Sequence, residues 1–336
     1  MLRGLSMFVM IFLHTSAYFL SVPLVFLLWN YSEFAVPIFI FCSSYVFFMK
    51  KYPIHTWQDI FAHIKKRLLR LLIPYYVFAV VFILIERIKE PSKLTYQYVF
   101  KNLFVVGGIS INWLVLLFIC FTFLMPFILY LHTKRGVLFY LFMLISGISA
   151  FLLMLYRFPL DYRFIFWLPW SLLVIFSLFV VENEHKKWFF PAMFFFWMIV
   201  FFTLQNLQVS LHHSITMYDN KYPPNLYHLA FGIFSTIGLY VIAKKGIFSL
   251  PLIKSLLLFL SKNSYSLFFI HWLVIYVMTV FFHFTFTWVS FFTTVFLFSI
   301  VMQIVLNRLS LLTRGIIASQ HYTWGQRSEY SQEHED

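Results

Sequence analysis

Residues 113–131 read WLVLLFICFTFLMPFILYL. This run of nineteen residues contains no charged side chain. At a rise of 1.5 Å per residue, a helix of that length is about 28 Å long, close to the ~30 Å hydrocarbon core of a bilayer. The stretch therefore predicts a membrane-spanning helix, a structure that satisfies its backbone hydrogen bonds internally.

Similar apolar runs recur along the whole chain. Of its 336 residues, 62% are hydrophobic and only 11% are charged, against about 25% in soluble domains. A chain so poor in charge cannot cover itself with polar surface in water. Alternating strands are too rare, and the 10 Gly and 12 Pro too sparse, for a transmembrane barrel. We therefore expect an all-α, polytopic membrane protein.

The pattern of apolar runs predicts about ten transmembrane helices. They cover residues 5–28, 34–49, 68–85, 113–131, 137–155, 164–181, 189–205, 227–243, 265–282 and 286–306. Residues 1–312 would form one membrane-embedded domain. The remaining residues, 313–336, are polar and predicted to be a disordered cytoplasmic tail.

The basic residues predict how the chain is oriented. Of the 25 Lys and Arg, 18 lie in the connections on the side of the two termini, and 7 lie in the other connections. Basic residues favour the cytoplasmic side, so both termini are expected in the cytoplasm of a cell-membrane protein. The net charge of +13 is then a topology signal, and we predict no nucleic-acid partner.

Two segments between the predicted spans have a helical pattern of their own. In residues 53–67, Trp57, Ile60, Phe61 and Ile64 recur at helical spacing among basic and polar residues. This pattern predicts an interfacial helix on the cytoplasmic face. Residues 247–260 are predicted to form a second interfacial helix or a partial span.

Two histidines lie where a bilayer disfavours polar side chains. His14 is near the middle of the first predicted span, and His271 lies in the ninth. Arg3 precedes His14 by eleven residues and therefore shares its helix face, and Ser264 precedes His271 by seven and shares its face. A buried histidine can be a hydrogen-bonded packing residue, but its cost in a membrane favours a functional role.

Basic and interfacial residues at the span ends leave two interpretations open. The run that contains Lys66, Arg67 and Arg70 is a topology anchor, and its two arginines, three residues apart on one face, could also reach one phosphate group. Trp113 starts the fourth span, as a residue of the interfacial aromatic belt or as part of a site. Arg157, Asp161 and Arg163 share a short outer loop, where a surface salt bridge is expected.

The sequence lacks the common cofactor signatures. It has no Walker motif, no GxGxxG and no His/Cys cluster with zinc spacing, so neither a metal nor a bound cofactor is predicted. Cys42 and Cys120 lie within apolar segments and are expected to be free, buried thiols.

Several segments together resemble one known family. They are Leu2-Arg3-Gly4-Leu5-Ser6 with His14, the Phe-rich stretch 36–47, the basic run Lys66-Arg67-Leu-Leu-Arg70 before Pro74-Tyr75, Asn112-Trp113-Leu114, and Ser261-Lys-Asn-Ser264-Tyr265 with His271. On these residues the chain resembles integral-membrane acyltransferase family 3, which includes polysaccharide O-acetyltransferases and the intercellular-adhesin O-acyltransferase group.

The resemblance implies transfer of an acyl group, expected to be acetyl, from cytoplasmic acyl-CoA to a hydroxyl of a cell-surface or lipid-linked carbohydrate. Acyl-CoA would be a co-substrate, the carbohydrate would be the acceptor at the membrane, and the lipid bilayer would surround the protein. The implied catalytic residues are His14 and Arg3. The implied acyl-CoA-binding residues are Lys66, Arg67 and Arg70, with His271, Tyr265, Ser264 and Trp113 in support.

The residues themselves are suited to that chemistry. A hydroxyl attacks a thioester slowly until a base removes its proton, and neutral histidine, with a reference pKa of about 6.5, is suited to do so. His14 is thus expected to be a general base or, less favoured, a transient acyl carrier. Two other classes stay open at this point: a transporter or flippase of lipid-linked saccharides, and a non-catalytic structural or sensory protein.

Overall fold

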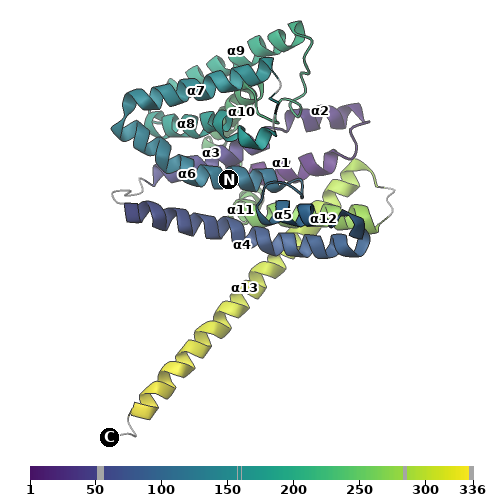
Figure 1. Ribbon diagram of the computed structural model, residues 1–336, viewed down its shortest axis with the longest axis vertical. Coiled ribbons are helices and arrows are strands. Elements are labelled where there is room, and N and C mark those ends of the chain that lie inside the picture. The colour runs from purple at the N-terminus through teal and green to yellow at the C-terminus, as the bar shows by residue number, and fades with distance from the viewer. Residues whose placement is uncertain (51–56, 157, 160, 283–285, 333–336) are drawn as a thin grey trace.

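The described part of the chain is helical and contains no β-strand. The computed structural model describes residues 1–50, 57–156, 158–159, 161–282 and 286–332, with side chains described up to residue 311 except that of Trp57. Figure 1 shows the long helices running roughly across the view and packed side by side in layers.

Over these residues there are thirteen α-helices and two short 3-10 helices. They are α1 (Leu2–Ser16), α2 (Pro23–Tyr31), α3 (Ala35–Met49), α4 (Trp57–Lys89), η1 (Pro91–Lys93), α5 (Tyr96–Leu103), α6 (Asn112–Lys134), α7 (Gly136–Leu155), η2 (Tyr162–Phe164), α8 (Trp167–Asn183), α9 (Phe189–Ser210), α10 (Leu226–Lys244), α11 (Pro251–Lys262), α12 (Ser264–Phe281) and α13 (Trp288–Gln332).

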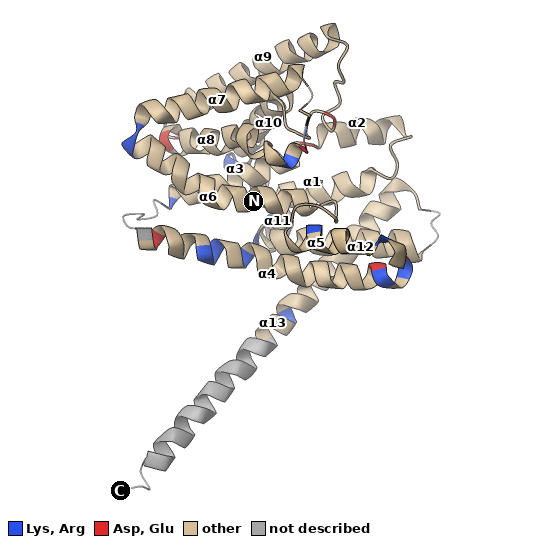
Figure 2. Cartoon of the chain, in the orientation of Figure 1, with Lys and Arg blue, Asp and Glu red and all other residues tan. Residues whose placement is uncertain are grey.

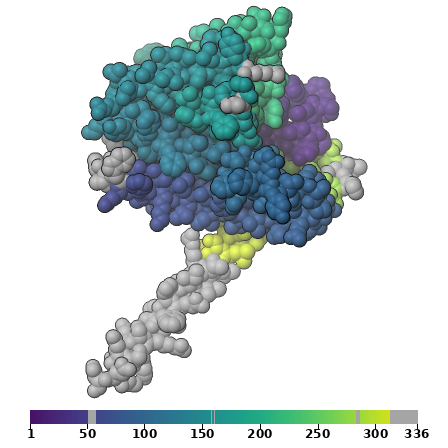
Figure 3. All heavy atoms as spheres, viewed as in Figure 1, coloured from purple at the N-terminus to yellow at the C-terminus, as the bar shows by residue number. Residues whose placement is uncertain are grey.

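The helices confirm an all-α polytopic membrane protein. Within the described residues, eight helical segments are long and apolar enough to cross a membrane, and α1 and α8 are shorter apolar helices. Figure 2 shows Lys and Arg mostly at the ends of the helices, whose middle parts carry few charges. Figure 3 shows α4 and α5 covering the lower part of one face, with α6 and α7 above them. A surface with charges at its two ends and apolar side chains between suits a bilayer.

The predicted first span, 5–28, is wrong as a single helix. Helix α1 ends at Ser16, and the separate helix α2 begins at Pro23. Proline has no N–H for the preceding turn, and it disfavours helical geometry in the residue before it. Val22 accordingly has an extended backbone, with φ −85° and ψ 115°. His14 therefore lies in the last turn of a short helix and not in the middle of a continuous span.

The predicted interfacial helix is wrong as a separate element. Residues 53–56 lie outside the described residues, and from Trp57 onward the segment belongs to α4, which continues to Lys89 with Pro74 inside it. Figure 2 shows basic residues extending several turns along this helix. Its polar face lines a cavity inside the protein, described below, while Phe61 on its apolar face is 68% exposed.

Helix α1 lies at the centre of the helical assembly. It packs against α3, α11, α12 and α13, and Figure 1 shows it between α3 and α11. Gly4 makes this packing possible, because a Cβ atom there would clash with the backbone carbonyl of Leu257 on α11. On the opposite side, Ser6 Oγ donates to the carbonyl oxygen of Ala35 at 2.6 Å. These contacts fix the position of the residues that α1 carries.

The C-terminal boundary predicted at residue 312 falls within α13. That helix continues to Gln332, through residues for which the sequence predicts a disordered tail. The division into a domain of residues 1–312 and a tail of 313–336 stays a prediction.

Candidate active site

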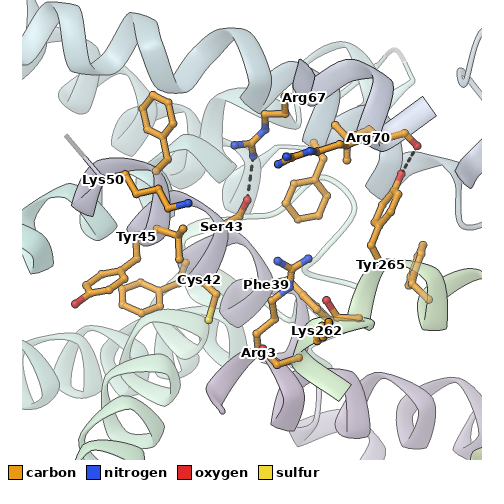
Figure 4. Close-up of a pocket in the computed structure, with 18 of the residues that line it drawn as sticks. Arg3, Phe39, Cys42, Ser43, Tyr45, Lys50, Arg67, Arg70, Lys262 and Tyr265 are labelled. Carbon is orange, nitrogen blue, oxygen red and sulfur yellow. Dashed lines mark hydrogen bonds between the residues drawn. The ribbon is translucent and has the colours of Figure 1, made fainter. Parts of the chain in front are cut away.

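A cavity of about 980 Å³ lies between the start of α1 and helices α3, α4, α6 and α12. Its volume is at the upper end of the range of about 300–1,000 Å³ that is usual for ligand sites. Figure 4 shows the guanidinium groups of Arg3 and Arg70 reaching from α1 and α4 toward the same space. The cavity is therefore a site formed by segments far apart in the sequence.

Cations dominate the polar part of the cavity wall. Asp59 is the one acidic side chain among the lining residues that the structure describes. The six basic lining residues are Arg3, Lys50, Lys66, Arg67, Arg70 and Lys262. A concave surface with this excess of positive charge attracts anions and concentrates them locally. The three residues predicted to bind acyl-CoA thus lie in one cavity with Arg3.

The basic residues of α4 reach the cavity because of their helical spacing. Asp59, His63, Lys66, Arg67 and Arg70 recur at intervals of three and four residues and so share one helix face. Arg67 Nη2 donates to Ser43 Oγ on α3 at 2.9 Å, which fixes the guanidinium against the opposite wall, as Figure 4 shows. The polar face of α4 therefore faces a protein cavity and not the membrane surface.

Two predicted residues of α12 complete the wall. Tyr265 lines the cavity, and its hydroxyl donates to the Leu71 carbonyl oxygen at 2.7 Å, so that α12 is tied to α4. Ser264 also lines the cavity. Its hydroxyl, like the Nε atom of Arg3, is buried and has no hydrogen-bond partner among the described residues. Buried polar groups are nearly always satisfied, so these two point to a polar ligand or water in the cavity.

The two intramembrane histidines are in direct contact. His14 Nδ1 lies 2.8 Å from His271 Nε2, although 257 residues separate them in the sequence. Their ring planes are parallel within 1°, and the Trp272 ring packs against His14 at 5.0 Å and 79°. His271 is fully buried, whereas His14 is half-buried. The pair thus consists of an enclosed histidine, His271, and a second histidine, His14, whose ring keeps some accessible surface.

The histidine pair is next to the cavity and not part of its lining. Neither histidine lines it, whereas Phe268 does. The Phe268 ring also lies 5.8 Å from the His271 ring, so this side chain separates the two features. Along α12, His271 lies about 10 Å beyond Ser264 and one turn beyond Phe268, both of which line the cavity. Arg3 and His14 thus occupy the two ends of α1, and only Arg3 reaches the cavity.

Trp113 does not line the cavity and lies in a cluster with residues of the loop between α9 and α10. The Lys221 ammonium is 5.2 Å from the centroid of the Trp113 ring and 5.2 Å from that of Tyr222. Lys221 Nζ also pairs with Glu33 Oε2 at 2.7 Å, and both side chains are buried. The pair joins the turn after α2 to the loop between α9 and α10. Trp113 contributes to that junction and lines neither the cavity nor the histidine pair.

Sequence reasoning missed part of the site. Tyr45 and Tyr240 line the cavity and also a neighbouring hollow of about 410 Å³ that Glu184 borders. The hydroxyl of Tyr240 donates to Glu184 at 2.7 Å and that of Tyr45 at 2.8 Å. These hydrogen bonds, that of Tyr240 first, hold the pKa of the Glu184 carboxyl below its usual value. A single sequence gives no signal for such a contact between α3, α8 and α10.

One smaller prediction is confirmed and another is confirmed in part. Arg163 Nη1 pairs with Asp161 Oδ2 at 2.6 Å on the surface, whereas residue 157 lies outside the described residues. Cys42 and Cys120 are free, which confirms that part of the prediction, but both are half-buried and not buried, and Cys42 lines the cavity.

Comparison with known families agrees with the resemblance in the sequence. The chain matches the family model Acyl_transf_3, described as an acyltransferase domain, over residues 1–308. No curated protein and no solved structure matches the chain. Family membership sets aside the transporter and the non-catalytic alternatives. The chain therefore belongs to acyltransferase family 3, and the protein is a multi-pass membrane acyltransferase.

Proposed function

We propose that the protein transfers an acyl group, acetyl in the simplest case, from acyl-CoA to a hydroxyl of a cell-surface or lipid-linked carbohydrate. One observation carries the choice of donor: a large cavity, lined among the described residues by six basic residues and one acid, is separated from a histidine pair only by the Phe268 side chain. Acyl-CoA has matching chemistry, because phosphates crowd its nucleotide end and its reactive thioester is at the end of an extended arm.

The phosphates would bind to the arginines of α4. Arg67 and Arg70 project from one face into the cavity, where two guanidiniums can bind one phosphate through charge-assisted hydrogen bonds. Lys66 and Lys262 would bind the remaining phosphate charge. Such contacts position the donor but leave the thioester free to extend toward α1 and α12.

The thioester would react at the inner end of the cavity. Arg3 Nε and Ser264 Oγ, buried donors without a partner among the described residues, would hold polar atoms of the extended arm where it passes along the cavity wall. His14 would take the proton of the acceptor hydroxyl, and the oxygen would then attack the carbonyl carbon. Phe268 would have to turn aside for the acyl group to meet the pair.

Orientation follows from the distribution of basic residues. We propose that the cavity faces the cytoplasm of a cell membrane, because the connections rich in Lys and Arg lie on its side of the chain. Reporter fusions after Leu207 and after Lys245 should then report opposite sides of the membrane. If both report the cytoplasm, the proposed topology is wrong.

Donor binding can be tested with the cysteine in the cavity wall. In a Cys120→Ser background, Cys42 is the one remaining thiol, and its alkylation by a maleimide measures access to the cavity. Acetyl-CoA, which has no free thiol to consume the maleimide, should slow the alkylation, and S-acetylpantetheine, which lacks the nucleotide phosphates, should not do so at the same concentration. Equal protection by both compounds, or none by either, would contradict a phosphate-binding role of the cavity.

Identifying the acceptor requires an analysis of the glycans and lipids of cells that make the protein. Mass spectrometry of surface glycans and lipid-linked saccharides from cells with and without the protein should show one ester modification that depends on it. The mass difference gives the acyl group directly. Identical glycan profiles would contradict a carbohydrate acceptor and leave the family chemistry with another hydroxyl substrate.

A further inference from the structure

A chain of hydrogen bonds connects the backbone of α12 to His14. His271 Nδ1 lies 2.8 Å from the carbonyl oxygen of Leu267, one turn earlier on the same helix. His271 Nε2 lies 2.8 Å from His14 Nδ1. Both nitrogens of His271 are therefore engaged, one by a backbone group and the other by the second histidine.

The chemistry of the partners fixes where the protons are. A carbonyl oxygen can only accept, so His271 Nδ1 carries a proton and donates it to Leu267. A second proton on His271 Nε2 would place a positive charge on a side chain that is 0% exposed, which is costly. His271 Nε2 is thus an acceptor, and His14 Nδ1 must be the donor. The lone pair of His14 is then on its Nε2 atom.

Burial identifies which ring can meet a substrate. His271 is enclosed, whereas His14 is half-buried. No hydrogen bond joins His14 Nε2 to any side chain or backbone group that the structure describes. The edge contact with Trp272 limits rotation of the His14 ring. The lone pair of His14 Nε2 is therefore held in one orientation on the less buried ring of the pair.

We propose that His271 is a positioning residue that holds His14 in the tautomer with a proton on Nδ1, so that His14 Nε2 is the base of the acyl transfer. This inference rests on the proposed function. In hydrolases and acyl transferases, a hydrogen bond from a neighbouring residue to one ring nitrogen commonly selects the tautomer of the catalytic histidine.

The protons and bonds balance around His14 alone. His14 Nε2 takes the proton of the acceptor hydroxyl while the oxygen bonds to the thioester carbon. The tetrahedral intermediate then breaks its C–S bond, and the leaving thiolate takes the proton from His14 Nε2. The products are the ester and free coenzyme A, and His14 is again neutral. The series of hydrogen bonds through His271 ends at the Leu267 carbonyl oxygen, which cannot take up a proton covalently. His271 therefore orients the His14 ring and stabilises the positive charge that His14 gains, without passing a proton onward.

Two substitutions at His271 distinguish the positioning of His14 by a hydrogen bond from a contribution of the His271 side chain to helix packing. In His271→Gln the amide oxygen takes the place of Nε2 and can accept from His14 Nδ1, whereas His271→Leu fills a similar volume without an acceptor. We expect the Gln variant to keep kcat within about tenfold of the wild type. The Leu variant should lose about 10²-fold or more, within the range for a disabled general base. The KM for acetyl-CoA should stay constant in both, because His271 does not line the cavity.

His228 provides a matched control. It is also fully buried, and its Nδ1 donates to the carbonyl oxygen of Met217 at 3.1 Å, but its Nε2 has no hydrogen-bond partner among the described residues. Gln and Leu at this position should therefore give equal kcat per mole of monodisperse protein. Activity is measured as transfer of label from [¹⁴C]acetyl-CoA to carbohydrate in membranes of cells that make the acceptor.

Each result supports or overturns the inference. If His271→Leu keeps kcat, or if His271→Gln is as inactive as the Leu variant while monodisperse, the positioning role is wrong. A rise in KM together with the loss of kcat would mean that His271 binds the donor. If wild-type membranes transfer no label above membranes without the protein, the proposed function itself fails, which is a different outcome.

A chemical probe tests the proton arrangement without activity. Diethyl pyrocarbonate modifies accessible, unprotonated imidazole nitrogens, and peptide mass spectrometry locates the product. The arrangement predicts modification of His14 and protection of His271 in the wild type. Modification of His271 with His14 protected would reverse the assignment of base and positioning residue.

Discussion

Replacement of Arg67 and Arg70 by Gln tests how the cavity binds its ligand. Both guanidiniums line the cavity from one face of α4, and Arg67 is fixed by its hydrogen bond to Ser43. Gln keeps hydrogen-bonding capacity and much of the side-chain length but removes the charge. We expect weaker binding of acetyl-CoA from each substitution, with the helix itself unchanged.

The expected size follows from the charged hydrogen bond that each substitution removes. A hydrogen bond to a charged group contributes about 1.5–3 kcal/mol, and about 1.4 kcal/mol corresponds to a tenfold change in affinity. Because both side chains remain accessible to solvent, the lower figure applies, and each substitution should raise the Kd about tenfold. The double variant should show a larger effect that falls short of the product, since neighbouring groups that bind one ligand are coupled.

Binding of labelled acetyl-CoA to the purified protein gives the Kd without knowledge of the acceptor. The control is Lys65→Gln, which removes one positive charge from the same stretch of α4 at an exposed position that does not line the cavity. Its Kd should stay within about twofold of the wild type. The wild-type Kd should also rise with salt, because screening weakens the attraction between exposed charges.

The reasoning is refuted if the arginine variants bind acetyl-CoA as the wild type does while reporter fusions show correct insertion. The basic run would then be a topology anchor only. Equal loss of affinity in Lys65→Gln would instead mean that net charge near the membrane, and not the cavity geometry, governs binding.

Three further predictions concern other parts of the fold. Phe268→Ala removes the wall between the cavity and His271, so butyryl-CoA should compete better with acetyl-CoA than it does in the wild type, and an unchanged ratio would contradict this role. Lys221→Met leaves the Glu33 carboxylate buried and unpaired, which should lower the free energy of unfolding by about 3–5 kcal/mol. Thermal unfolding in detergent measures this loss, and little change would show that the ion pair does not stabilise the fold. Gly4→Val should displace α11 and lower the yield of folded protein, because the carbonyl of Leu257 occupies the space of a side chain, and normal yield would contradict that packing.

The helices could be predicted from the sequence because the membrane imposes a simple pattern. Apolar runs bounded by charged or polar residues have one stable structure in a bilayer, and α3, α6, α7, α9, α10 and α12 each begin within three residues of the predicted starts. The break between α1 and α2 was also accessible, since Pro23 follows Val22 inside an apolar run. For residues 5–28 the hydropathy was given more weight than Pro23, and the prediction was therefore one span instead of two helices.

The basic face of α4 shows a limit of helical periodicity. The pattern correctly predicts which residues share a face, but a polar cavity and the membrane surface select the same side chains. To decide whether this face of α4 lies against a cavity or at the membrane surface, one must know which helices lie opposite it, and these are α3, α6 and α12.

The pairing of polar residues could not be predicted from one sequence. His14 and His271 were each identified by their cost in a bilayer, yet nothing in the sequence brings residues 257 positions apart together. The same holds for Glu33 and Lys221, which the sequence separates by 188 positions. The two histidines were visible as exceptions in their own segments, Glu33 and Lys221 were not, and only the packing of the helices reveals the partner of each group.

The most direct test of the account measures acyl transfer by the His14→Gln variant. Membranes that contain the wild-type protein should transfer label from [¹⁴C]acetyl-CoA to carbohydrate and release free coenzyme A. Gln at position 14 retains hydrogen bonding but cannot take a proton, so transfer should fall by about 10²–10⁴-fold while expression, insertion and acetyl-CoA binding stay normal. If the Gln variant retains most of the wild-type rate, His14 is not the base and the central claim is wrong.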